Sequence, residues 1–171
     1  MLRNLKKRSE GFTIIEVLIV LAIAGLILLI VFLAVPALQR NSRNSGRKSD
    51  VSRIGGAVIE FMNNNNGEKP QSTDLPAIKN AIGSLGQYDS ASATAITLEQ
   101  FSASLADYTP NKDTVRIVVG AKCRTGTTAQ QGNTPASSNI GKVEAAGSRQ
   151  VALQWASEGG SNSLSRSCTE F

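Results

Sequence analysis

The stretch that decides the fold is Gly11-Phe-Thr-Ile-Ile-Glu-Val-Leu-Ile-Val20, which continues as an apolar run to Val35. All nineteen residues from Val17 to Val35 are apolar or glycine. A helix that rises about 1.5 Å per residue needs about 20 such residues to cross the hydrocarbon core of a bilayer. One carboxylate, Glu16, stands at the threshold of this run, where a charge is costly unless it has a partner. The sequence therefore predicts one membrane-spanning helix that carries a functionally important acid near its start.

The net charge of +5 comes from two short basic segments, one on each side of the apolar run. Residues 1–11 carry four cations and one acid, residues 40–53 carry five cations and one acid, and the rest of the chain is slightly acidic. This distribution describes the flanks of a membrane helix rather than a nucleic-acid-binding face. Binding to nucleic acid through the basic segment at 40–53 is a less favoured alternative, because no aromatic residues are interleaved with the cations.

No group of residues with the spacing of a catalytic or cofactor site is present. The chain has no histidine, the commonest general base and metal ligand, and no glycine-rich phosphate loop. Asp107 and Asp113 flank a polar loop that could hold Ca²⁺, but their spacing matches no known calcium loop, so a solvated loop is the preferred interpretation. We therefore predict a protein that is not an enzyme and has no cofactor and no metal.

Residues 1–11 form a short basic leader, but the apolar run behind it is too long for a secretory signal peptide. Such signals have an apolar segment of about 7–15 residues followed by a small-residue cleavage site, and here Pro36-Ala-Leu-Gln-Arg40 follows instead. An uncleaved signal anchor, with its basic end held in the cytoplasm, is one interpretation.

The chain begins with a basic leader that ends in Gly11 and is followed by F-T-I-I-E-V-L-I-V. This arrangement resembles the type IV prepilins. In that family a membrane peptidase cuts after the glycine and methylates the new N-terminal residue, which is usually phenylalanine. The resemblance implies that Gly11 is the last leader residue, that Phe12 is the N-methylated mature terminus and that Glu16 is the acid at the fifth mature position. It also implies a prepilin peptidase, an assembly ATPase, a membrane platform protein and copies of the chain itself as partners.

Glu16 and the amine that cleavage would create on Phe12 are natural partners. Each charge is costly alone in hydrocarbon, and pairing offsets much of that cost. The pair could form within one chain, since the two residues lie one helical turn apart, or between neighbouring subunits, where it would set the stagger of a filament. The alternative is that the Glu16 side chain reaches the membrane interface alone.

Gly25 and Pro36 are candidate break points in the helix. Glycine weakens a helix, and proline removes a backbone hydrogen bond. In pilin filaments the segment between a glycine and a proline at similar places can lose its helical structure on assembly. A mild kink that a membrane helix tolerates is the alternative.

Residues 37–66 are predicted to continue the same helix into water. Its interior face has two parts: an apolar part that should carry the head domain, and a basic part that should stay free near lipid headgroups or neighbouring subunits. The apolar part consists of Val51, Ile54, Val58 and Phe61, and the basic part of Arg40, Arg43 and Arg47. The run of asparagines at 63–66, with Gly67 and Pro70 behind it, should end the helix.

Residues 67–171 are predicted to form a globular head. Residues 67–110 should be linking loops and short helices, with one helix at 75–85 and another opened by the capping-box spacing Thr97-Leu-Glu-Gln100. Residues 111–171 should form an antiparallel sheet of about three strands, at 114–120, 150–157 and 163–169. On an exported protein Cys123 and Cys168 should form a disulfide that closes this region, as in many pilins, and it would stabilise the head by about 3–4 kcal/mol. Two free thiols are the alternative.

The predicted fold class is α+β: a long N-terminal spine helix on a small antiparallel sheet, shaped like a lollipop. The predicted segments are a leader at 1–11, a membrane and polymerisation helix at 12–36, its amphipathic continuation at 37–66 and the head at 67–171. The resemblance implies a major pilin, held in the cytoplasmic membrane as a precursor and extracellular once assembled. A pseudopilin of a secretion or DNA-uptake machine, a minor pilin, and a signal-anchored binding protein that does not polymerise are the alternatives.

Overall fold

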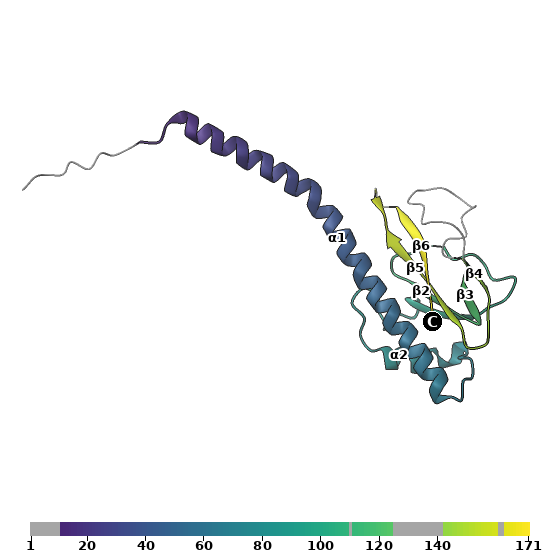
Figure 1. Ribbon diagram of the computed structural model, residues 1–171. Coiled ribbons are helices and arrows are strands. Elements are labelled where there is room, and N and C mark those ends of the chain that lie inside the picture. Colours follow the sequence, from purple (N-terminus) through teal and green to yellow (C-terminus); the bar gives the residue numbers. More distant parts are fainter. Residues whose placement is uncertain (1–10, 110, 125–141, 161–162) are drawn as a thin grey trace, which may run out of the picture. The chain divides into compact units, whose positions relative to one another are not determined.

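The computed structural model describes residues 11–109, 111–124, 142–160 and 163–171. The chain divides into two compact units, Met1–Leu38 and Gln39–Phe171, and one helix, α1, runs through both. The elements in chain order are α1 (Ile14–Asn64), η1 (Ser72–Asp74), α2 (Leu75–Ile82), β1 (Ile96–Gln100), β2 (Val115–Val119), β3 (Ala121–Cys123), β4 (Val143–Ala145), β5 (Val151–Glu158) and β6 (Leu164–Glu170) (Figure 1).

In the first unit the helix stands without any covering layer. Its large apolar side chains are exposed to solvent all round the helix, from Phe12 to Leu38. Among the described residues α1 is the one helix long and apolar enough to cross a membrane. This exposure is what the nineteen-residue apolar run predicts, because a helix that is apolar on every side needs lipid or protein around it.

Helix α1 is continuous through each glycine and through Pro36, and it ends where the asparagine run predicts. Beyond Asn64 the backbone turns back on itself, with Asn66 and Gly67 at positive φ (56° and 80°). The Gly67 amide donates to the Met62 carbonyl over 2.7 Å, which satisfies one of the carbonyls left open at the helix end.

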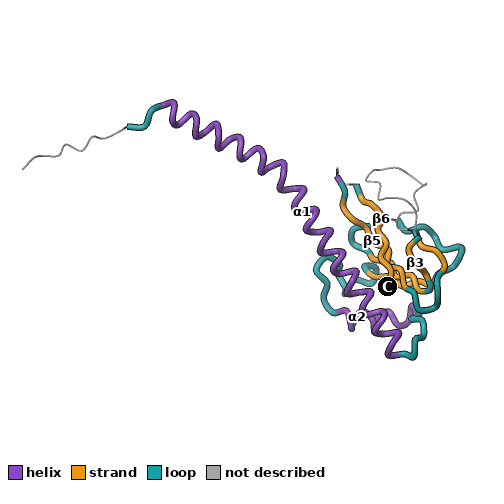
Figure 2. The backbone as a smooth tube through the Cα atoms, viewed as in Figure 1, coloured by secondary structure: helices purple, strands orange, loops and turns teal. Residues whose placement is uncertain are grey.

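The second unit has three layers, and the middle one is a four-stranded sheet with the order β1-β2-β5-β6. Figure 2 distinguishes the helices of the chain from its strands by colour. One face packs against residues 39–64 of α1 and against α2, and it buries Val51, Ile54 and Val58 completely, as predicted. The other face is covered by the two-stranded sheet β3-β4 and the segment after β1, with Val118 and Ala152 at its centre. The sheet is therefore buried on both faces, which explains why β2 is buried along its whole length.

The predicted α+β class is confirmed, with strands β2, β5 and β6 and helix α2 close to their predicted places. The helix predicted to open at Thr97 is wrong, because this segment is strand β1. Ile96 and Leu98 point into the core in the two-residue alternation of a strand, and β1 pairs in parallel with β2. Tertiary pairing outweighs the capping-box signal here, and it makes the sheet mixed rather than purely antiparallel.

Candidate functional site

The predicted processing junction lies at an open position just before α1. The side chain of Phe12 is 89% exposed, and a Cβ atom placed on Gly11 would meet no other atom within 4 Å. Residues 1–10 of the predicted leader lie outside the described residues. The Gly11–Phe12 bond is therefore not shielded by any described part of the chain, as cleavage by a membrane peptidase would require.

Glu16 is already engaged in the uncleaved chain, with Thr13 as its partner. The Glu16 carboxylate accepts from the Thr13 amide over 2.9 Å and from the Thr13 hydroxyl over 2.7 Å, while the Glu16 amide donates to the hydroxyl oxygen over 3.4 Å. This arrangement is a capping box, Thr13-x-x-Glu16. The spacing of its two residues is visible in the sequence, but the predictions above do not include a cap at this place. Its pairing with a new amine on Phe12 stays a prediction, and the cap places the carboxylate within one residue of that amine.

Gly25 and Pro36 lie inside the continuous helix, so neither breaks α1 in the isolated chain. A Cβ atom on Gly25 would meet no atom within 4 Å, so no packing inside this chain requires a glycine there. Loss of helical structure between these residues on assembly stays a prediction.

The basic part of the helix face is not free, and the prediction that it would be is wrong. It forms what we call the arginine clamp, in which Arg43, Asn44 and Arg47 hold Glu158 at the end of β5. The carboxylate of Glu158 lies 2.6 Å from Arg43 Nη2 and 2.7 Å from Arg47 Nη2. The Asn44 side chain donates to the Glu158 carbonyl over 2.9 Å and accepts from the Glu158 amide over 2.8 Å. The clamp joins segments more than 110 residues apart, a contact that helix periodicity does not reveal.

The two arginines of the clamp differ in their surroundings. The Arg47 side chain is 5% exposed and that of Arg43 is 43% exposed, whereas Glu158 is 16% exposed. Hydrogen bonds from Arg43 lower the pKa of Glu158 to about 2, with a further contribution from Arg47 and an opposing one from partial burial. Glu158 is therefore ionised at neutral pH, as the buried Arg47 charge requires.

Two buried polar atoms beside the clamp lack a partner among the described residues, Arg47 Nε and the Tyr88 hydroxyl. Burial raises the pKa of Tyr88 well above its ordinary value, and the nearby Arg47 charge only partly opposes this. Asp50 lies one turn beyond Arg47, and each of its carboxylate oxygens accepts a hydrogen bond, from the amides of Gly86 and Gln87 over 3.1 and 2.6 Å. The helix is thus attached to the rest of the unit by polar contacts as well as by its apolar core.

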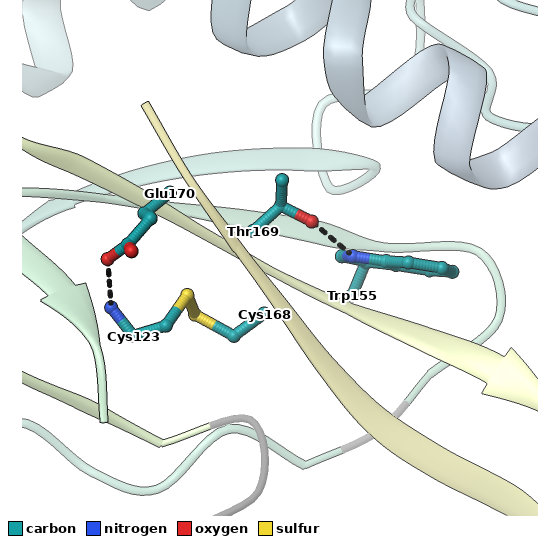
Figure 3. Close-up of a disulfide and its surroundings, with 5 residues drawn as sticks. All are labelled: Cys123, Trp155, Cys168, Thr169 and Glu170. Carbon is teal, nitrogen blue, oxygen red and sulfur yellow. Dashed lines mark hydrogen bonds between the residues drawn. A yellow bond between two sulfur atoms is a disulfide. The ribbon is translucent and has the colours of Figure 1, made fainter. Parts of the chain in front are cut away.

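Cys123 and Cys168 form the predicted disulfide, with a Cα–Cα distance of 5.8 Å (Figure 3). It ties β3 to β6, so it joins the small sheet to the edge of the main sheet. The Cys123 amide donates to the Glu170 carboxylate over 3.3 Å, and on the opposite side of β6 the Trp155 indole donates to Thr169 over 3.3 Å. The last strand is thereby held to its neighbours from both faces.

The two aspartates considered as calcium ligands, Asp107 and Asp113, have different surroundings. Asp107 pairs with Lys142 over 3.1 Å and with Arg166 over 3.8 Å, while Asp113 lies at the edge of a hollow beside the clamp. In the part of the chain that the structure describes, no three His, Cys, Asp or Glu side chains cluster in a way that could hold a metal ion.

Comparison with protein-family models finds the prokaryotic N-terminal methylation motif at residues 6–32. The chain carries the leader signature of type IV prepilins. Comparisons with curated proteins and with solved structures find no match. The match covers part of the leader, the predicted cleavage site and most of the apolar run.

The prepilin signature supports a type IV pilin-like or pseudopilin precursor, which is a structural subunit rather than an enzyme. It implies processing by a prepilin peptidase and handling by pilus assembly machinery. Together with the apolar helix it fits a precursor anchored in the membrane.

Proposed function

We propose that this chain is the major subunit of an extracellular type IV filament. In this proposal the leader is cut after Gly11, Phe12 is N-methylated, and residues 12–36 pass from the membrane into the core of a helical homopolymer. Residues 37–66 continue this helix and carry the head at 67–171 on the filament surface.

The observation that carries the proposal is the contrast between the two units. The second unit buries its own core, whereas the apolar side chains of residues 14–38 have no protein cover in the isolated chain. Such a surface needs lipid or copies of itself, and the prepilin signature at its start supports a chain that uses both in succession.

Transfer from lipid into a filament gains little free energy from apolar burial alone, because lipid tails and neighbouring helices are similarly apolar. The proposal therefore requires a specific interaction that appears on assembly and machinery that does work on the subunit. The pair between the Phe12 amine and Glu16 is the interaction we assign to this step, with Thr13 holding the carboxylate close to the amine beforehand.

The test is to shear the surface of cells that express this chain, collect the polymers and measure the mass of the N-terminal peptide. We expect a peptide that starts at Phe12 and is about 14 Da heavier than the unmodified peptide, the mass that one methyl group adds. Recovery of an intact N-terminus from the membrane fraction alone would refute the proposal in favour of a signal anchor. A processed and methylated chain that is rare in the polymers would point instead to a minor pilin or a pseudopilin.

Gly11→Val gives the matching loss-of-processing variant. Because a Cβ atom added at Gly11 meets no atom of the described residues within 4 Å, we attribute any block to the peptidase and not to the fold. Gly56→Val is the control, since a Cβ atom there also meets no described atom within 4 Å, and Gly56 lies 45 positions along the sequence from Gly11. We expect full-length Gly11→Val in the membrane and normal processing of Gly56→Val.

A further inference from the structure

A hollow of about 470 Å³ lies in the second unit beside the arginine clamp. Its charged lining consists of Arg40, Arg43, Arg47, Lys112, Asp113 and Glu158. Four cations against two carboxylates leave a formal charge of +2 on the walls. A concave site with one predominant sign of charge concentrates ions of the opposite sign.

Two of these cations are not committed to a carboxylate. Glu158 is shared by Arg43 and Arg47, whereas Arg40 donates to the Gly159 carbonyl over 3.2 Å and forms no ion pair with a residue that the structure describes. Among the described residues Lys112 forms no ion pair. The positive charge that remains for a ligand therefore comes chiefly from Arg40 and Lys112.

An unsatisfied buried donor lies on one of the residues that line the hollow. Arg47 lines the hollow and is buried, and its Nε has no acceptor among the described residues. Buried donors without an acceptor are rare in folded proteins, because they lose water and gain nothing in return. Because this Nε is shielded from solvent, a ligand in the hollow would act on Arg47 through its charge rather than through a bond to that atom, and its acceptor oxygens would neutralise the walls.

The hollow also has an apolar edge. Leu164, at the start of β6, lines it and is 38% exposed, and no other large apolar side chain among the described residues of the second unit is as exposed. In sequence, Arg40 follows the exposed Leu38 by two residues and the end of the apolar run at Val35 by five. A phosphate group attached to an apolar chain would match both the cations and this edge.

We infer that this hollow binds a phosphate group, presented by an anionic phospholipid headgroup or as free phosphate. Arg40 and Lys112 supply the charge, and the guanidinium groups of the clamp supply oriented N–H donors. The site belongs to the second unit alone, so it does not depend on whether the chain polymerises.

The test uses the full chain in uncharged maltoside micelles and isothermal titration calorimetry at constant ionic strength. The three probes are inorganic phosphate, dihexanoylphosphatidylglycerol and dihexanoylphosphatidylcholine, the last having the same phosphodiester and chains without net charge. Saturable binding of phosphate or phosphatidylglycerol that exceeds phosphatidylcholine binding by at least about tenfold supports the site. Phosphatidylglycerol binding tighter than phosphate by about tenfold assigns the lipid as the source, and similar affinities assign free phosphate.

Arg40→Gln and Lys112→Gln remove the uncommitted charges, and Lys48→Gln is the matched control on an exposed position of the same helix outside the hollow. We expect each of the first two to weaken binding about two- to fivefold, the range for single cations with solvent access. The double variant should lose about tenfold or more, and the control less than twofold. Unchanged near-ultraviolet circular dichroism checks that each variant is folded. The absence of saturable binding by both anionic probes, or an equal loss in the Lys48→Gln control, would overturn the inference.

Discussion

Glu158→Gln is the sharpest test of how the spine helix is attached to the sheet. The change keeps the size of the side chain but removes its charge and replaces one acceptor oxygen by an NH2 donor, so Arg47 is left as a buried cation without this counterion. Arg43 also loses its partner, at a smaller cost because its side chain is nearly half exposed. We expect the second unit to remain folded but less stable.

The magnitude follows from two separate arguments. A pKa of Glu158 lowered from 4.5 to about 2 corresponds to at most about 3.4 kcal/mol, at 1.36 kcal/mol per pKa unit. Solvent screening at this edge of the unit reduces that figure to about 2 kcal/mol. Removing one partner of a fully buried pair costs about 3–5 kcal/mol. Here Glu158 is partly exposed and Arg47 keeps the Asn44 oxygen at 3.4 Å, so a value below that range is expected. We therefore predict a loss of about 2 kcal/mol.

The loss should depend on pH in a defined direction. Because the pKa of Glu158 is lower in the folded protein, the unfolded chain binds more protons between pH 4.5 and about 2. The stabilising contribution is therefore complete above pH 4.5 and disappears as the pH falls through this range. Since glutamine does not titrate, the difference between the native chain and Glu158→Gln should shrink as the pH falls below 4.5 and approach zero below about pH 2.

The assay is urea unfolding in maltoside micelles, followed by the fluorescence of Trp155. This is the one tryptophan of the chain, and it is buried in the sheet that the clamp secures. Glu144→Gln is the control, because it breaks the exposed contact with Lys122 at 3.2 Å and should cost less than about 1 kcal/mol. Equal losses for the two variants, or a difference from the native chain that stays constant with pH, would refute this account of the clamp.

Three further predictions concern the rest of the chain. Gly55→Ala should lower the free energy of unfolding by about 1–3 kcal/mol, because the added methyl group runs into the Phe171 ring. The added methyl group of Gly56→Ala enters open space, so this change should raise the free energy of unfolding by about 0.5–1 kcal/mol through helix propensity. The same urea titration compares the two variants, and equal effects would contradict the packing of Gly55 against Phe171. Cys123→Ser should lower the free energy of unfolding by about 3–4 kcal/mol and speed proteolysis of β6, and unchanged digestion would argue against a stabilising bridge. Glu16→Val and Glu16→Gln should both be cleaved yet yield about tenfold fewer filaments, whereas normal filaments from Glu16→Gln alone would show that the cap on α1 matters and the charge does not.

Local sequence patterns are sufficient to predict the structure wherever one segment determines its own conformation. The nineteen apolar residues predict the exposed helix, because a run of this length is long enough to cross a bilayer and is apolar on every side. The asparagine run and Gly67 predict the end of α1, and the two-residue alternation predicts β5. The motif around Gly11 and Glu16, which carries the prepilin signature, is equally local.

Contacts between distant segments determine strand β1 and the arginine clamp, which the sequence patterns did not predict. Thr97–Gln100 has the spacing of a helix start, yet it forms a strand because β2 supplies a parallel partner for its backbone and a core for Ile96 and Leu98. Arg40, Arg43 and Arg47 have the periodicity of a solvated face. Glu158 nevertheless engages Arg43 and Arg47, because the sheet places the end of β5 against that face. Helical periodicity assigns residues to a face of α1, but the partner that meets the face comes from a segment more than 110 residues away, and only the tertiary fold determines that meeting.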